Sequence, residues 1–325
     1  MRNATFATLA LCSLLAACSG TPTGPHLPDI QIMDTGVFPE SITSSLNGTV
    51  YSGSTKGVIY RAMPGTAQAT AWITHSEQNG LLSILGVLAD DRSNTLWVCS
   101  APNFFGPELS KGVTALKAFE LSSGRLKGSY DFPAPAGVCN DIAIDADGSA
   151  YATDTTNGRL FRRRNGANTL ELVGSDPLLV GIDGLTFTAS GNLYVNNVRS
   201  NQIYRVAIKP NGSMGTLLPL KISYTLSGPD GMRLVRGNTI VLAESTIGRL
   251  SIITIDGDKT LMTVLRNDLE SSPGATVVGN TVYVAKSSIK YLLQPELKGK
   301  EPPPAMLYAV PLPLMPLMPQ TPQKP

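Results

Sequence analysis

Four side chains with oxygen donors recur at one position of a repeated pattern in this sequence. Glu40, Asn140 and Asp183 each precede a tyrosine by eleven residues, and Asp230 precedes an isoleucine by ten. Oxygen ligands of this kind suit hard cations such as Ca2+, Mg2+ and Mn2+, whereas catalytic zinc usually takes His or Cys. Three carboxylates facing one another would repel strongly unless a cation lay between them. The set therefore predicts a divalent metal site, most simply for Ca2+, with Mg2+, Mn2+ or Zn2+ as alternatives.

A cation held in this way could support hydrolysis of an ester. It would polarise the carbonyl and offset the charge that develops on its oxygen. A carboxylate of the set could accept a proton from the attacking water, and an amide could orient a small-molecule substrate. Asp154 and Lys286, each three residues past a strand marker, are further candidates for substrate binding. Without that role, Asp154 would form a turn and Lys286 would be solvated.

Acyl-enzyme chemistry has little support in the sequence. The only histidines are His26 and His75, and His75 is expected in an exposed loop. No Gly-x-Ser-x-Gly motif and no cysteine nucleophile pattern is present. Metal-assisted attack of water therefore remains the leading hypothesis.

Six copies of one sequence unit position these side chains. Each copy has a short apolar run, a turn with Gly or Asn, a marked strand and a polar turn. The strand markers are 46, 54, 43, 46 and 43 residues apart: Tyr51, Trp97, Tyr151, Tyr194, Ile240 and Tyr283. Repeats of this length with four short strands are typical of β-propellers. We therefore predict an all-β fold, a six-bladed β-propeller of four-stranded antiparallel blades, over residues 30–312.

A propeller would bring the four candidate ligands together. Their shared position is the start of the innermost strand, where the blades crowd around the axis and equivalent residues face one another. By the same count, blades two and six carry Gly86 and Pro273 there. We also expect residues 30–34 to form an outer strand that closes the ring against blade six.

These residues also carry a family resemblance, which spans about residues 35–312. The motifs are Phe38-Pro-Glu40, Asn140-Asp141, Asp183-Gly-Leu-Thr-Phe187 and Gly228-Pro-Asp-Gly-Met232. They resemble the gluconolactonase and regucalcin (senescence marker protein) family of six-bladed propellers, with paraoxonases and strictosidine synthases as more distant relatives. Together with the four oxygen donors, the resemblance implies metal-assisted hydrolysis of a lactone or related ester, with Asp230 as the base for the attacking water and Asn140 orienting the substrate.

The resemblance implies roles for single residues. In that family a blade-one Glu, a blade-four Asn and a blade-five Asp hold a divalent metal, and the blade-five Asp is the proposed base. These positions fall on Glu40, Asp183 and Asp230, while Asn140 matches an Asn that binds substrate or metal. Two departures make gluconolactone itself less expected: Asp183 replaces the usual Asn, and Val138 replaces a substrate-binding Arg.

The two ends of the chain lie outside the predicted ring. Residues 1–17 combine Arg2 with an apolar stretch from Ala4 to Ala17, which is typical of a signal peptide and too short to span a bilayer. The stretch ends in Leu-Ala-Ala-Cys18, which resembles a bacterial lipobox. We expect Cys18 to be lipidated, with residues 18–29 as a tether and 313–325 as a disordered Pro-rich tail. The mature protein would then be an exported lipoprotein, membrane-anchored on the periplasmic side of the cell envelope; an ordinary signal peptide is the alternative.

Composition narrows the possible partners. The net charge is +2, and residues 162–164 form the only basic run, so nucleic acid is not an expected partner. We expect a monomer. Cys99 and Cys139 are expected as two buried small hydrophobes, with a disulfide as the alternative. A rival hypothesis for function is a non-catalytic propeller lipoprotein that binds a ligand or protein, with a structural cation that ties the blades together.

Overall fold

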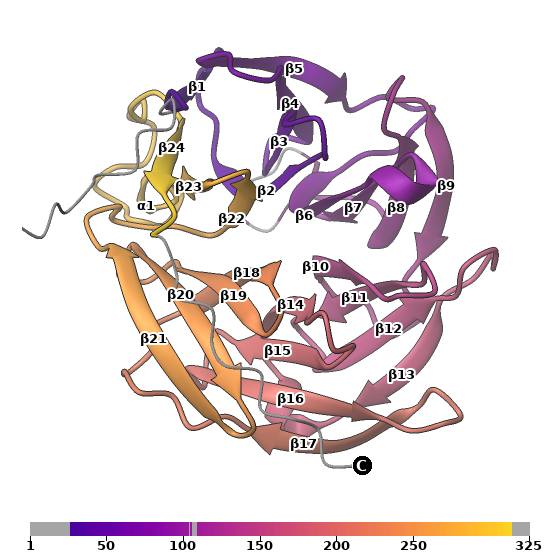
Figure 1. Cartoon of the computed structure of the whole chain (residues 1–325). Coiled ribbons are helices and arrows are strands. Elements are labelled where there is room, and N and C mark those ends of the chain that lie inside the picture. The colour runs from indigo at the N-terminus through magenta and orange to yellow at the C-terminus, as the bar shows by residue number, and fades with distance from the viewer. Residues whose placement is uncertain (1–26, 104, 106–108, 314–325) are drawn as a thin grey trace, which may run out of the picture.

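The described residues form the six blades of a β-propeller (Figure 1). Four blades are separate four-stranded antiparallel sheets, and the first and last blades are joined into one eight-stranded sheet. The computed structural model describes residues 27–103, 105 and 109–313. The predicted signal peptide, Cys18, the tether up to residue 26 and the tail from residue 314 lie outside the described residues. The prediction of an all-β six-bladed propeller is confirmed.

The first three blades follow one another along the chain. Blade one contains β2 (Pro39–Ser44), β3 (Val50–Ser54), β4 (Val58–Ala62) and β5 (Gln68–Thr74). Blade two contains β6 (Ser83–Asp90), β7 (Thr95–Ala101), β8 (Ala115–Glu120) and β9 (Leu126–Asp131), with a short 3-10 turn at Asp91–Ser93. Blade three contains β10 (Cys139–Ile144), β11 (Ala150–Asp154), β12 (Arg159–Arg163) and β13 (Glu171–Ser175).

The remaining blades complete the ring. Blade four contains β14 (Ile182–Phe187), β15 (Leu193–Asn197), β16 (Gln202–Ile208) and β17 (Met214–Pro219), preceded by a 3-10 turn at Pro177–Leu179. Blade five contains β18 (Pro229–Arg236), β19 (Thr239–Glu244), β20 (Arg249–Asp256) and β21 (Lys259–Arg266). Blade six contains β22 (Ala275–Val278), β23 (Thr281–Lys286), β24 (Met306–Pro311) and β1 (Ile30–Ile32), with helix α1 (Lys290–Leu293) in its long loop.

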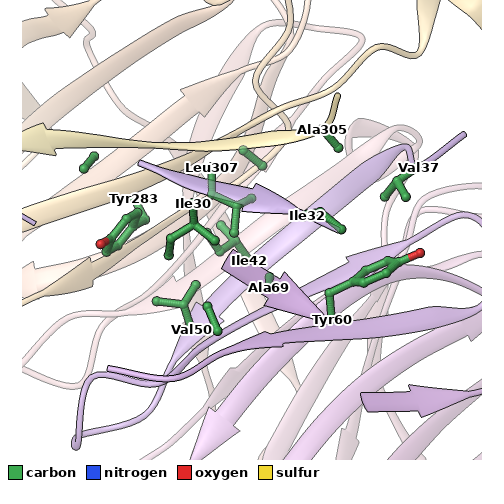
Figure 2. Close-up of a cluster of buried hydrophobic side chains, with 13 residues drawn as sticks. Ile30, Ile32, Val37, Ile42, Val50, Tyr60, Ala69, Tyr283, Ala305 and Leu307 are labelled. Carbon is green, nitrogen blue, oxygen red and sulfur yellow. The ribbon is translucent and has the colours of Figure 1, made fainter. Parts of the chain in front are cut away.

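The N-terminal strand β1 joins the last blade to the first. It pairs antiparallel with β24 of blade six and parallel with β5 of blade one. Its side chains Ile30 and Ile32 pack with Leu307 and Tyr283 of blade six and with Ile42 of blade one (Figure 2). The prediction that this segment supplies an outer strand beside blade six is confirmed, although the strand ends at Ile32.

The strand markers are buried in the apolar clusters around the blades. Tyr51, Trp97, Tyr151, Tyr194 and Tyr283 are each at most 4% exposed. The register identifies Val241 rather than Ile240 as the blade-five marker, because Val241 pairs with Arg233 as Tyr51 pairs with Thr43. With Val241 as the marker, Asp230 also stands eleven residues before it, as the ligands of blades one, three and four do.

Five of the six innermost strands carry a β-bulge near their first residue, and the candidate ligands lie in these bulges. In blade one, Pro39 pairs with Ser54 and Ser41 pairs with Gly53, so Glu40 is the extra residue. Asn140, Asp183 and Asp230 occupy the matching place in β10, β14 and β18. A bulge bends its strand and redirects side chains. We call this end of the propeller axis the mouth.

The prediction of Gly86 for blade two is wrong by one residue. Ile84 pairs with Ser100 and Gly86 with Cys99, so Leu85 occupies the bulge. The marker Trp97 pairs with Leu88, nine residues earlier, whereas Tyr51 pairs with Thr43, eight residues earlier, and this extra residue shifts the count. Blade two therefore offers an apolar side chain at this position, as Pro273 does in blade six.

The expectation that Cys99 and Cys139 stay unpaired is also wrong. They form a disulfide, with Cα atoms 5.0 Å apart, between β7 of blade two and β10 of blade three. Both residues are fully buried.

Within the part of the chain that the structure describes, no helix has the length and apolar character needed to cross a membrane.

Candidate metal and catalytic centre

The mouth brings the four predicted residues into one group. Asn140 donates from Nδ2 to Asp183 Oδ2 at 2.9 Å and to Thr155 Oγ1 at 3.0 Å. The carboxyls of Asp183 and Asp230 share a hydrogen bond. Glu40 acts on both aspartates through its charge, and its buried Oε1 has no hydrogen-bond partner among the described residues.

The surroundings of the three carboxyls favour their neutral forms. Burial, followed by the charge of Asp183, raises the pKa of Glu40 to about 8. Burial, followed by the charge of Asp141, raises the pKa of Asp183 to about 7. Burial and the charges of Asp183 and Glu40 raise the pKa of Asp230 well above its usual value. Three acids in this position must carry protons or be compensated by a positive charge.

A divalent cation fits this donor set. It would neutralise the repulsion that raises the three pKa values, and it would give the unpartnered Glu40 oxygen a ligand role. Both amide hydrogens of Asn140 are already donated inside the site, which leaves Oδ1 as its remaining group. The match is one of chemistry and not of geometry: within residues 27–103, 105 and 109–313, no group of three or more His, Cys, Asp or Glu side chains could hold a metal ion as placed.

In blades two, three and four, one repeat position ties the blade to the ligand-bearing strand of the next blade. In blade two it is Cys99, whose disulfide partner Cys139 directly precedes Asn140. In blade three it is Thr153, whose hydroxyl donates to the carbonyl of Asp183 at 2.8 Å. In blade four it is Asn196, whose amide donates to the carbonyl of Asp230. These bonds hold the backbone at or beside three of the four candidate ligands. The residues that make them stand two positions after the strand markers, a place in the repeat where no site residue was predicted.

Gly184 allows blades four and five to approach each other beside Asp183. A Cβ at this position would lie 2.1 Å from the carbonyl oxygen of Asp230, closer than any side chain tolerates. The Gly184 amide also donates to Asn196 Oδ1 at 3.0 Å. The Asp-Gly sequence, which by itself suggests only a turn, here lets the two aspartates come together.

Asp154 supports the site from inside blade three instead of lining the mouth. It is fully buried, and Arg159 donates to it from Nε at 2.6 Å. Asp154 also accepts the backbone amide of Val138 at 3.0 Å, and a Cβ at Gly137 would collide with its carboxylate. The structure therefore does not place Asp154 in contact with a substrate; it shapes the loop that leads into Asn140.

Blade five repeats this arrangement with different residues. Glu244 is fully buried, accepts from Arg249 and accepts the amide of Ser227 at 2.8 Å. Arg249 also donates to the carbonyl of Thr225 at 2.7 Å. This pair shapes the loop before Asp230 as the Asp154–Arg159 pair shapes the loop before Asn140. Glu244 was not among the predicted site residues, because the misassigned marker Ile240 displaced the count by one.

Lys286 occupies the same repeat position in blade six, but it is only partly buried. Its nearest recorded ion-pair partner is Glu270, with Nζ and Oε2 3.8 Å apart. Glu270 also binds Lys290 at 3.0 Å. Lys286 is therefore engaged with this acid, and among the described residues no ion pair joins it to the four candidate ligands.

Hydroxyl groups one residue further along the second strands reach the ligands. Thr155 accepts from Asn140 and donates to the carbonyl of Ile182 at 2.7 Å. Ser245 makes a side-chain hydrogen bond to Asp230, which lowers the pKa of that aspartate against the other influences. These two residues follow Asp154 and Glu244 directly, so the sequence repeat contained a signal for them.

A buried ion pair crosses the axis beneath the ligands. Arg233 of β18 donates from both terminal nitrogens to Asp141 of β10, at 2.8 and 2.9 Å. It also donates to the carbonyl of Val87 on β6 at 3.1 Å. Arg233 also lines a pocket of about 350 Å³ further along the innermost strands. The residues that pair with the strand markers in the other five blades line the same pocket: Thr43, Leu88, Ala143, Thr186 and Thr276. Blades two, three and five are thus tied together under the mouth.

The fold and this mouth define a class: a six-bladed propeller with acidic and amide side chains gathered at one end of its axis. Comparisons with solved structures agree with the class. The chain is similar to regucalcin, a calcium-binding protein from Agrobacterium tumefaciens, with TM-score 0.62, 13% identity and coverage of 90% of this chain and 97% of that one. It is also similar to a luciferin-regenerating enzyme, with TM-score 0.63, 11% identity and coverage of 86% and 92%.

A third similar structure carries a gluconolactonase assignment. It has TM-score 0.58 and 15% identity, and the match covers 87% of this chain and 91% of that one. These similarities, at low sequence identity, establish the propeller fold that gluconolactonase-like and regucalcin-like proteins share. No protein-family model matches the sequence, and no curated protein matches it either.

Proposed function

We propose that the protein is a metal-dependent hydrolase of a lactone or a related ester, acting at the propeller mouth. The observation that carries the proposal is the group of three carboxyls with raised pKa values around Asn140, of which Asp183 is buried and Glu40 and Asp230 are half-buried. The structural similarity to gluconolactonase-like and regucalcin-like propellers supports it at the level of the fold. Ca2+ is the first candidate for the cation, because every donor is an oxygen.

The residues at the mouth divide the work between binding and proton transfer. Glu40, Asp183, Asp230 and the Oδ1 atom of Asn140 would hold the cation. A divalent cation bound there supplies Lewis acidity, which polarises an ester carbonyl. Asp230 would accept a proton from the attacking water, because its raised pKa makes it a stronger base than an ordinary aspartate.

Asn140 has a narrower role in this proposal than as a donor to substrate. Its Nδ2 group is committed to Asp183 and Thr155, so Asn140 acts as a ligand and as a fixed link between blades three and four. Orientation of the substrate would then depend on other side chains at the mouth.

The test measures bound metal and turnover on the same purified protein. Elemental analysis should find about one divalent ion per chain, and a panel of lactones should be hydrolysed by metal-loaded protein and not after chelation. Asp230→Asn should abolish hydrolysis while Asp258→Asn, a change at an exposed aspartate, should leave it intact. Turnover that survives both chelation and Asp230→Asn would refute the mechanism. Stoichiometric metal without turnover of any lactone would favour the rival function, a binding propeller with a structural cation.

We also propose that the protein is exported and held to the periplasmic side of a bacterial membrane by a lipid on Cys18. The support is the sequence before Cys18, an apolar stretch that ends in Leu-Ala-Ala. A propeller tethered in this way would meet small substrates in the cell envelope.

A further inference from the structure

Two long loops flank blade one on the side of the mouth. The connection between the second and third strands is short in blade one (55–57) and in blade three (155–158). The same connection covers residues 102–114 in blade two, of which 104 and 106–108 are not described, and residues 287–305 in blade six. Blades two and six are the two neighbours of blade one, so both insertions border the same part of the mouth.

The blade-two loop lies directly on blade one. A Cβ at Gly57, in the turn between β3 and β4, would lie 2.6 Å from Leu109 Cδ1. Gly57 has φ +71°, so glycine suits this turn for its conformation as well as for its size. The absence of a side chain on Gly57 thus lets Leu109 pack close to blade one.

Residues of blade one and described residues of the two loops line an open pocket of about 720 Å³. Its apolar lining is Phe38 from blade one, Phe105 and Leu109 from the blade-two loop, and Leu292 from α1 in the blade-six loop. We call it the blade-one pocket. Its volume is in the range of pockets that bind small organic ligands.

The cationic side chains of this pocket are already engaged within the protein. Lys56 donates to Asp34 at 3.0 Å and to the carbonyl of Thr35 at 2.8 Å. His75 is exposed, as the sequence predicts, and its Nδ1 is hydrogen-bonded with the carbonyl of Leu81. The pocket therefore suits an apolar group better than an anionic one.

The blade-one pocket is lined by residues that are close to Glu40 in the chain or equivalent to a contact of Asn140, although none of the four candidate ligands lines it. Phe38 stands two residues before Glu40. Thr55, which also lines the pocket, occupies in blade one the place that Thr155 occupies in blade three, and Thr155 contacts Asn140 directly. A molecule held at the mouth by its carbonyl could therefore extend into this pocket.

We propose that the blade-one pocket binds an alkyl or aryl substituent of the lactone or ester, so the substrate class is one with an apolar side chain rather than a polyhydroxylated sugar lactone. This inference rests on the proposed function, which places the ester group at the mouth. Burial of one methylene group is worth about a fourfold gain in affinity. Affinity should therefore rise with chain length until the pocket is full.

The test uses three probes with one ring and different alkyl chains: γ-butyrolactone, γ-octalactone and γ-dodecalactone. Binding to the chelated full-length protein is measured by calorimetry, and KM is measured separately on metal-loaded protein. We expect the dissociation constant and KM each to fall by about tenfold or more from γ-butyrolactone to γ-octalactone. Leu292→Ser should remove most of this gain, whereas Leu293→Ser should not, because Leu293 on the same helix is 61% exposed and does not line the pocket.

The outcomes separate the two proposals. Lactone hydrolysis with dissociation constants and KM values that do not depend on chain length would overturn the substrate class and leave the hydrolase proposal standing. Chain-length-dependent binding that Leu292→Ser weakens, without turnover of any lactone, would overturn the hydrolase proposal and keep the pocket assignment. Equal losses in Leu292→Ser and Leu293→Ser would overturn the pocket assignment.

Discussion

Arg233 on the innermost strand of blade five binds Asp141 on the innermost strand of blade three through two hydrogen bonds of 2.8 and 2.9 Å. Both side chains are largely buried, at 11% and 5% exposure. The pair closes the floor of the mouth directly beneath the candidate metal ligands. It also places a guanidinium next to the carboxylate whose charge raises the pKa of Asp183.

Removing one partner of this pair should destabilise the protein strongly. Arg233→Met leaves Asp141 buried without its counter-charge, which typically costs about 3–5 kcal/mol. Urea unfolding should show this loss, and the double variant Arg233→Met/Asp141→Leu should recover much of it, because it buries no charge. Lys221→Met, at an exposed ion pair, serves as the control and should change little. A single variant as stable as the wild type would contradict the structural role of the pair.

The metal-free protein should lose stability as the pH rises. The pKa of Glu40 is raised from 4.5 to about 8 and that of Asp183 from 3.8 to about 7, so the folded state binds protons more tightly than the unfolded chain. The stabilisation is complete below the unfolded pKa values and disappears as the pH rises through the folded ones. The Tm of chelated protein should therefore fall between about pH 5 and pH 8.

Divalent cation should reverse that loss. Added Ca2+ should raise the Tm most at the alkaline end of the range, where the carboxyls would otherwise repel one another. The double variant Glu40→Gln/Asp183→Asn should show a flatter pH profile and a much smaller response to Ca2+. A Tm of chelated wild-type protein that stays constant across this range would count against the acid cluster.

A methyl group at Gly184 should separate the two aspartates. Gly184→Ala places a Cβ where the Asp230 carbonyl oxygen lies, so blades four and five must move apart. Displacement of a group that orients ligands typically lowers metal affinity by about tenfold or more. Calorimetric titration with Ca2+ measures this loss. Gly215→Ala, where the nearest atom to a Cβ is 3.3 Å away, is the matched control, and equal losses in the two variants would refute the explanation.

The disulfide between Cys99 and Cys139 should stabilise both the ring and the site. Cys99→Ser should lower the free energy of unfolding by about 2–4 kcal/mol. Because Cys139 directly precedes Asn140, the same variant should also weaken metal binding. Treatment of wild-type protein with a reductant should reproduce both effects and should not affect Cys99→Ser further. If reductant changed the variant as much as the wild type, the disulfide would not be the cause of the lower stability and the weaker metal binding.

Lipidation at Cys18 should decide where the protein resides. In a bacterial host, wild-type protein should fractionate with membranes and carry a lipid mass on its N-terminal peptide. Cys18→Ala should yield soluble protein or uncleaved precursor without that mass, while Cys12→Ala, within the apolar stretch, should behave as wild type. Membrane association of Cys18→Ala protein that has lost its signal peptide would contradict a lipid anchor on this residue.

The sequence by itself was enough to predict the ring of blades and the place of the candidate ligands within the repeat. Turn residues and buried markers recur at a period that only a four-stranded blade explains, and Glu40, Asn140, Asp183 and Asp230 share one place in that period. Counting from a marker failed where a turn changed length or a neighbour was mistaken for the marker. These errors assigned Gly86 instead of Leu85 to blade two and hid Glu244.

Only the tertiary structure decided which polar residues act on the ligands. The Cys99–Cys139 bond, the Arg233–Asp141 pair and the blade-one pocket each join segments from different blades, and their partners are 40 or more residues apart or lie in irregular loops. A repeat pattern specifies the surroundings of a residue within its own blade. It carries no information about the side chain that approaches from a neighbouring blade, because that depends on how closely the backbones meet at the axis.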